Sequence, residues 1–287
     1  MGRFSAAASL VDDDYQPLIA IQHGEKDRPP VFCIPGAGAG IAYFSPLARQ
    51  LGGIAVYGFQ PRGLDGEAPP LDSVEVMAKS YLHALTPFAA QAPLRLVGHS
   101  FGAWVALEMA LRLRAAGRAL DTLILLDAPP PATPDTPARR YDDLATIQKL
   151  VELLERASQR SLGLGAEQLA AAASDTRIDL LRQAMVARGI VSARTPINAI
   201  QAMVRVFAIN INTTYRPLSS YPSRTVLVRA SNEDRCRSSS VECVATWQHF
   251  APRLEVIDGP GNHMTMLSAT HAAALARIVL PLWQTFS

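Results

Sequence analysis

The sequence has little net charge, and this excludes several binding classes. Its 287 residues include 27 Lys and Arg and 25 Asp and Glu, which gives a formal net charge of +2. A charge so close to balance offers no electrostatic basis for binding nucleic acid or a membrane surface. The first residues also lack the apolar core of a signal peptide, and no apolar run approaches the length of a membrane span. We therefore expect a cytoplasmic protein without nucleic-acid or membrane partners.

Cysteine is equally scarce. The three cysteines, Cys33, Cys236 and Cys243, are an odd number and lack the spacing of metal ligands. They are typical of reduced thiols, and we predict neither disulfides nor a metal site. In contrast, 49% of the residues are hydrophobic, which is enough to bury the core of one large α/β domain with an insertion.

The centre of the chain holds a motif that catalytic serines often occupy. A short apolar run at 94–97 leads into Gly-His-Ser-Phe-Gly at 98–102, and residues 103–116 follow with helical spacing. Strand, sharp turn and helix form the context of a nucleophile elbow, which holds its serine in a strained turn above a sheet. Ser100 is therefore the candidate nucleophile. The alternative is a tight turn between strand and helix with an idle serine.

Strand-like and helix-like segments alternate through most of the chain. A helix capped by Ser73 is predicted to run to about residue 90, and a closing helix to cover about 268–283. This alternation predicts an α/β fold with a mostly parallel central sheet flanked by helices, and chemistry at the carboxyl ends of the strands. Besides the elbow strand, the predicted strands cover 18–22, 31–34, 54–59, 122–127, 224–230 and 253–257.

The character of the sequence changes after residue 128. A proline-rich segment leads into three helical patterns without a strand-like run between them. A helical insertion after a strand that ends at the catalytic edge is typical of a lid. The predicted organisation is a flexible leader at 1–15, an α/β core at 16–130 and 222–287, and a helical lid at 131–221. The helical patterns cover about 141–158, 177–188 and 196–211, and residues 163–174 are either a mobile connection or a further short helix.

A glycine-rich loop at 35–40 follows the second predicted strand. It lacks the Gly-Lys-Ser/Thr and Gly-x-Gly-x-x-Gly patterns of phosphate-binding loops. The favoured interpretation is a loop whose backbone N–H groups face the elbow, so that Ala37 and Phe101 form an oxyanion hole. The alternative is a loop that uses its glycines only to turn tightly.

A serine hydroxyl needs a positioned base, usually a histidine oriented by a carboxylate. Of the six histidines, His263 alone lies in a Gly/Pro-rich loop after the final predicted strand. His99 adjoins the serine and is expected to point away from it. His263 is the candidate base, and the alternative is an ordinary surface histidine.

Two aspartates compete for the role of the acid. Asp127 ends the strand that follows the elbow helix, and Asp234 lies in the loop after the next strand. Both preserve the chain order serine, acid, histidine. Asp127 leads because an aspartate at the end of an apolar strand is costly to bury unless it is paired. Asp234 remains the alternative acid.

Several of these segments together resemble the thioesterase domains that end nonribosomal peptide synthetases and modular polyketide synthases. The resemblance implies an α/β-hydrolase fold and a Ser100–His263–Asp127 triad, with the oxyanion hole at the backbone of Ala37 and Phe101. It covers the predicted core well and the predicted lid poorly. The matching segments are PPVFCIPGAGAG (29–40), FQPRGLDGE (59–67), LRLVGHSFGAWVALEMALRLRAAG (94–117), DTLILLDAPPP (121–131) and GNHMTML (261–267).

The resemblance also implies a reaction and a partner. Ser100 would take an acyl or peptidyl chain from the phosphopantetheine thioester of a carrier protein and release it by hydrolysis or macrocyclisation. The phosphopantetheine belongs to the carrier, so no bound cofactor or metal is expected. The polar leader favours a domain joined to an upstream carrier domain. The alternatives are a stand-alone editing (type II) thioesterase, a generic serine esterase and, least favoured, a non-catalytic binder.

Overall fold

A seven-stranded sheet forms the centre of the computed structural model, which describes residues 15–88, 93–118, 120–137, 140–231 and 241–283. Its strand order is β1-β3-β2-β4-β5-β6-β7. All neighbouring strands are parallel except β1 and β3, so the predicted mostly parallel sheet is confirmed. The strands are β1 (Leu18–Gln22), β2 (Val31–Ile34), β3 (Val56–Phe59), β4 (Leu94–His99), β5 (Leu120–Leu126), β6 (Thr225–Ala230) and β7 (Leu254–Gly259).

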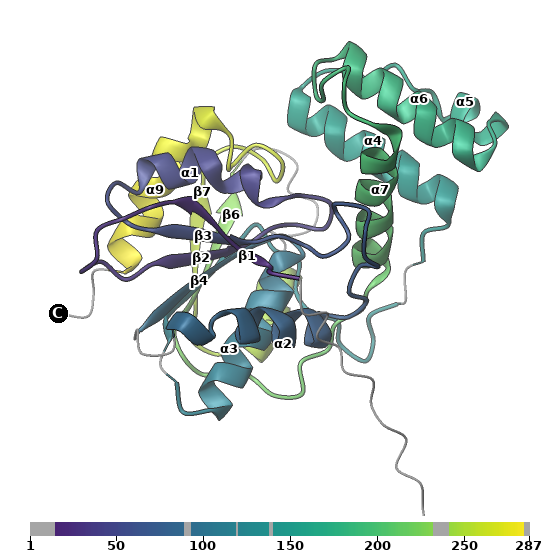
Figure 1. Ribbon diagram of the computed structural model, residues 1–287. Helices are drawn as coiled ribbons and strands as arrows, with labels where there is room; N and C mark the ends of the chain where they lie inside the picture. The colour runs from purple at the N-terminus through teal and green to yellow at the C-terminus, as the bar shows by residue number, and fades with distance from the viewer. Residues whose placement is uncertain (1–14, 89–92, 119, 138–139, 232–240, 284–287) are drawn as a thin grey trace, which may run out of the picture.

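Helices cover both faces of the sheet (Figure 1). On one face lie α2 (Val74–Ala84), α3 (Gly102–Ala115) and α8 (Val241–Phe250), which share an apolar cluster with the strands. On the other face lie α1 (Ser45–Gln50) and α9 (Ala269–Leu282). Two short 3-10 helices, η1 (Ile41–Phe44) and η2 (Thr86–Phe88), complete the body. The sheet is therefore the middle of three layers.

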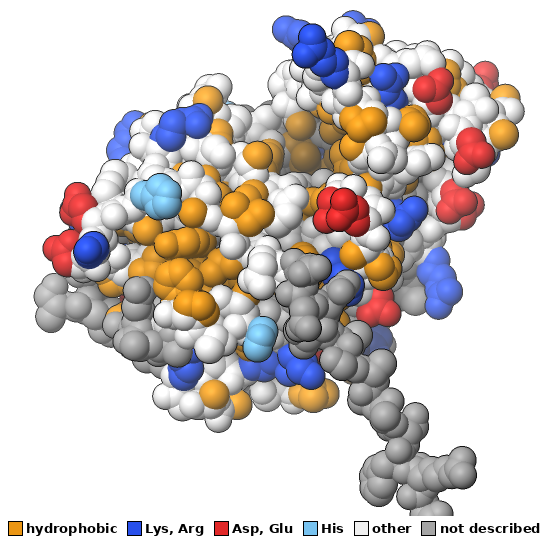
Figure 2. Space-filling model, viewed as in Figure 1, with side chains coloured by type: hydrophobic (Ala, Val, Ile, Leu, Met, Phe, Trp, Pro, Cys, Tyr) orange, Lys and Arg blue, Asp and Glu red, His pale blue; other side chains and the backbone are white. Residues whose placement is uncertain are grey.

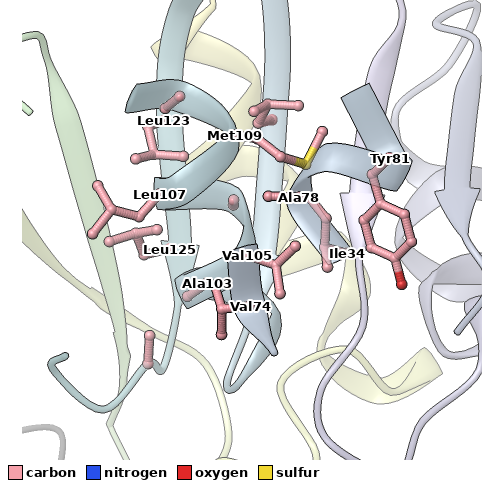
Figure 3. Close-up of a cluster of buried hydrophobic side chains, with 14 of the residues drawn as sticks. Ile34, Val74, Ala78, Tyr81, Ala103, Val105, Leu107, Met109, Leu123 and Leu125 are labelled. Carbon is pink, nitrogen blue, oxygen red and sulfur yellow. The ribbon is translucent and has the colours of Figure 1, made fainter. Parts of the chain in front are cut away.

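The central strands are apolar on both sides because both of their faces are covered. In β5, Leu123 and Leu125 point into the cluster under α3, whereas Ile124 and Leu126 point into the cluster under α9. Figure 3 shows Leu123 and Leu125 next to Leu107 of α3. This alternation with a period of two fixes the register of the strand, since a slip by one residue would exchange its two faces.

The helices between β5 and β6 form a separate layer, which we call the lid. It consists of α4 (Asp143–Ser158), α5 (Ala166–Ala171), α6 (Ser174–Ala187) and α7 (Ile197–Asn212). These helices enclose their own apolar cluster, and α4 to α6 stand away from the sheet while α7 leads back to it (Figure 1). The Asp142 side chain caps α4 by accepting a hydrogen bond from the Ala145 N–H at 2.8 Å. Besides the three predicted helical patterns, the lid contains the additional short helix α5.

The return from the lid packs with the body. Tyr215 and Tyr221 are buried in the cluster that includes α3, and the Tyr215 hydroxyl donates to Glu108 Oε2 at 2.8 Å. The helical lid thus ends at Asn212, before the predicted boundary at 221. Two tyrosine rings gain more by joining the large body cluster than by extending the small one in the lid.

Two further boundaries differ from the sequence-based expectation. Ser73 caps α2 by accepting from the Val76 N–H, but the helix ends at Ala84 rather than near residue 90. Pro87 disfavours helical backbone at the residue before it, and residues 86–88 form η2 instead. Tyr15, predicted as part of the leader, is half-buried and donates its hydroxyl to Gln60 O at 2.7 Å. In the described part of the chain, every helix is too short or too polar to cross a membrane.

Candidate active site

Ser100 occupies a strained turn between β4 and α3. Its φ is +54°, a left-handed conformation that side-chain-bearing residues rarely adopt. The flanking glycines allow this turn: a Cβ at Gly98 would lie 2.5 Å from Gly102 O, and a Cβ at Gly102 would lie 2.4 Å from Ile34 O. Strands and helix thus approach so closely that only glycine fits at either position. Ser100 therefore stands at the carboxyl end of β4, two residues before α3 begins.

The glycine-rich loop at 35–40 lies against the elbow. A Cβ at Gly36 would come within 3.3 Å of the Ser100 Cβ. Two residues further on, a Cβ at Gly38 would come within 3.0 Å of Phe207 on α7. Ala37 therefore lies between the candidate nucleophile and the lid.

His263 and Asp127 are brought together by the sheet. The His263 Nδ1 lies 2.8 Å from Asp127 Oδ2, and Asp127 Oδ1 accepts a second hydrogen bond from the Ala230 N–H at 2.9 Å. The Asp127 side chain is only 6% exposed and that of His263 28%. An ionised carboxylate only accepts, so Nδ1 carries the proton and Nε2 keeps a lone pair. A neutral histidine in this tautomer can take a proton through Nε2.

Asp127, like Ser100, has a left-handed backbone, with φ of +41°. Its N–H donates to Val228 O at 2.8 Å, as if β5 continued by one residue. The two residues that follow Asp127 are held by their carbonyls. The first accepts from the indole N–H of Trp247 at 3.0 Å, and the second from that of Trp104 at 2.9 Å. These contacts fix the chain on both sides of the carboxylate. The alternative acid, Asp234, lies outside the described residues.

His99 connects the elbow to the loop that carries His263. The His99 Nε2 lies 3.0 Å from the backbone oxygen of His263, which only accepts, so Nε2 carries the proton. The two imidazole rings have centroids 5.0 Å apart. Burial, and then the positive charge that His263 can carry, lower the pKa of His99 to about 3. His99 is thus a neutral donor beside the candidate base.

Tyr43 supports the same loop from η1, and the sequence had not indicated it. Its ring centroid lies 5.5 Å from that of His99, and its hydroxyl donates to Met264 O. The carbonyls of two consecutive loop residues are therefore held by side chains from two other parts of the chain. Only a contact prediction between distant residues would have found this, since nothing near Tyr43 marks it.

Figure 2 shows a hollow between the body and the lid, with hydrophobic side chains in it. α7 contacts the body through Phe207, which lies against Gly38, and through Asn210, whose amide nitrogen donates to Ala37 O at 2.7 Å. Within the described ranges, no group of three or more His, Cys, Asp or Glu side chains is placed to hold a metal ion. The site thus combines a serine elbow and a histidine paired with a buried aspartate at the carboxyl edge of the sheet.

Curated relatives of this chain are large biosynthetic enzymes. The chain is 34% identical over 118 residues to malpibaldin synthetase of Mortierella alpina, a match that covers 41% of this chain and 2% of the relative. It is 24% identical over 270 residues to microperfuranone synthase of Emericella nidulans, covering 92% of this chain and 29% of the relative. The chain therefore spans only a small part of the length of these relatives.

Solved structures share the fold at low sequence identity. A four-domain nonribosomal peptide synthetase, holo-AB3403, matches 93% of this chain with 20% of its own, at a TM-score of 0.81 and 21% identity. YbtT, a type II thioesterase from the yersiniabactin pathway, matches 94% of this chain with all of its own, at a TM-score of 0.64 and 19% identity. The family model "Thioesterase domain" matches residues 29–282, most of the chain. The chain belongs to the thioesterase domain family, related to the thioesterases of nonribosomal peptide and polyketide synthases.

Proposed function

We propose that this protein is a serine thioesterase in which Ser100, His263 and Asp127 form the catalytic triad. The observation that carries the proposal is the 2.8 Å hydrogen bond between His263 and the buried Asp127, on the same sheet edge as a serine with φ of +54°. The membership of the family supports the reaction class. We further propose that the acyl or peptidyl chain arrives as a phosphopantetheine thioester on a carrier protein.

The first half-reaction transfers the acyl group to the serine. His263 Nε2 takes the proton of the Ser100 hydroxyl as the oxygen attacks the thioester carbonyl. The negative charge that develops on the carbonyl oxygen is stabilised by the N–H groups of Ala37 and Phe101 and by the N-terminus of α3. Collapse of the tetrahedral intermediate breaks the C–S bond, and His263 returns its proton to the departing thiolate. Asp127 remains ionised and stabilises the imidazolium.

The second half-reaction releases the chain. His263 removes a proton from water, or from an amine or hydroxyl of the same chain, and the resulting nucleophile attacks the acyl-serine. The products are a free acid or a macrocycle, and Ser100 regains its proton. Whether water or a group of the chain itself attacks the acyl-serine depends on how far the recess under the lid excludes water. An apolar recess favours substrates whose acyl part is itself apolar.

Intact-protein mass spectrometry after incubation with carrier-bound acyl and peptidyl thioesters tests this proposal. The wild type is expected to gain the mass of the acyl group and then to lose it with formation of free acid or cyclic product. Ser100→Ala is expected to gain no mass. Turnover of simple oxygen esters without any adduct from thioesters would instead favour a generic esterase. Inertness toward both substrate classes would leave a non-catalytic binder.

A further inference from the structure

Asn210 lies on α7 of the lid and carries a buried side-chain amide. The burial of this amide is hard to explain as a contribution to the stability of the fold. The residue is 3% exposed, and its Oδ1 has no hydrogen-bond partner among the described residues. A buried polar atom without a partner reduces the stability of a fold. The amide nitrogen makes one hydrogen bond, to Ala37 O at 2.7 Å, across 173 positions of sequence. A carbonyl oxygen only accepts, so the nitrogen and not the oxygen faces the loop.

The partner of this hydrogen bond lies at the centre of the candidate oxyanion hole. Ala37 is flanked by Gly36, which lies against Ser100, and by Gly38, which lies against Phe207 of α7. Glycines on both sides give this segment more backbone freedom than other residues would. A hydrogen bond to the Ala37 carbonyl restricts that freedom at the one residue whose N–H is to face the substrate oxygen.

We propose that Asn210 is a positioning residue of the oxyanion hole. By holding the Ala37 carbonyl it fixes the peptide plane that follows Ala37 and so limits the movement of the Ala37 N–H on the other side of the same residue. The alignment of this N–H with the reacting carbonyl oxygen then depends on where α7 lies. A substrate that displaces α7 therefore changes the rate of acylation as well as its own affinity. This inference rests on the proposed role of Ala37 in catalysis.

The chain offers a matched control on the same helix. Asn212 is two residues further along α7, and its side chain serves only the lid: it accepts from the Tyr141 N–H at 2.7 Å and donates to Tyr141 O at 3.1 Å. It also donates to Ala208 O. Asn212→Ala therefore disturbs the lid without removing a contact to the glycine-rich loop at 35–40, whereas Asn210→Ala removes the contact to Ala37.

The experiment compares single-turnover acylation of the two variants and the wild type. Removal of an oxyanion-hole donor typically slows the chemical step by about 10²–10³-fold. Because Asn210 acts through Ala37, we expect Asn210→Ala to slow acylation by about 10- to 100-fold with little change in KM, and Asn212→Ala to slow it by less than about threefold. Asn210→Leu, which keeps the volume and removes the donor, carries the same test if the alanine variant does not fold. Equal losses in both variants, or no loss in Asn210→Ala, would overturn the inference.

A fluorophosphonate probe separates this inference from the proposed function. The probe reacts with an activated serine and forms a tetrahedral adduct without any thioester. If thioesters fail on the wild type but the probe labels Ser100, more slowly in Asn210→Ala than in Asn212→Ala, the thioesterase proposal fails and the role of Asn210 stands. If the probe does not label the wild type, both fail.

Discussion

The body and the lid use the same apolar residue types under different constraints. In the body, both faces of the central strands are buried, and a Cβ added at either elbow glycine would lie within 2.5 Å of a neighbouring backbone oxygen. In the lid, four helices share one small cluster, and Gly165 has no atom within 4 Å of its would-be Cβ. The body therefore leaves no room for a side chain at the elbow, whereas the lid has room for one at Gly165. Asn210 and Phe207 of α7 connect the lid to the glycine-rich loop at 35–40 of the body.

The largest contrast is expected in catalysis. Asp127→Asn keeps the shape of the acid but favours the wrong histidine tautomer, and we expect acylation to fall by about 10⁴-fold. The same substitution in the lid, Asp142→Asn, retains a good helix cap and is expected to change the rate by less than about twofold. Single-turnover kinetics checks both variants. If Asp127→Asn slowed acylation only slightly, Asp234 would instead be the favoured acid.

Core truncations should differ in how far their effect spreads. Leu125 of β5 and Leu181 of α6 are both 0% exposed, so replacing either by alanine is expected to cost about 2–5 kcal/mol locally. Leu125→Ala should accelerate hydrogen exchange throughout the sheet, whereas Leu181→Ala should accelerate it only in α4 to α7. Hydrogen-exchange mass spectrometry distinguishes these outcomes. Faster exchange in β4 and β5 of Leu181→Ala would show that lid and body unfold together.

Two glycines provide a smaller and purely steric contrast. Gly102→Ala places a Cβ 2.4 Å from Ile34 O and Pro35 O, and we expect a loss of about 1–3 kcal/mol in the free energy of unfolding. Gly165→Ala meets open space with an ordinary backbone, and its effect should stay within about 0.5 kcal/mol. Chemical denaturation measures both. Equal stability of the two variants would contradict the close approach at the elbow.

The last effect is small for each pH unit, and it concerns the body alone. His99 has a folded pKa of about 3, below its ordinary value of 6.5, because it is buried. As the pH falls below 6.5 the unfolded chain binds a proton that the folded chain does not, so stability is lost toward acid by about 1 kcal/mol per pH unit. His99→Gln should flatten this loss between pH 6.5 and 4. The free energy of unfolding is measured by urea titration of the wild type and His99→Gln at several pH values. An equal loss of stability with falling pH in both proteins would exclude the buried neutral histidine.

Local pattern was enough to predict the residues that end strands. Ser100, Asp127 and His263 each follow an apolar run or a Gly/Pro-rich turn, and such signals mark the carboxyl edge of a parallel sheet. The side chains that hold the neighbouring loops carry no such mark. Asn210 acts on Ala37 and Tyr43 on the carbonyl of Met264, each across more than 170 positions of sequence.

The lid shows the same division between local and distant information. The amphipathic spacing of α4 and α7 was legible in the sequence, and the start of α4 follows from the cap at Asp142. The end of the lid was not, because the burial of Tyr215 depends on Trp104 and Glu108 in the body. Elements follow from neighbouring residues, whereas their borders here depend on packing between distant ones.

Peptide mapping of the acyl-enzyme tests the central claim most directly. Trypsin cuts after Arg95 and Arg112, so the fragment 96–112 contains Ser100 as its only serine and no threonine, lysine or cysteine. After brief incubation with a carrier-bound acyl thioester and an acid quench, this fragment is predicted to gain the mass of the acyl group, with the modification on Ser100. An unmodified fragment in a protein that turns over the thioester, or an acyl group on any other peptide, would contradict the account.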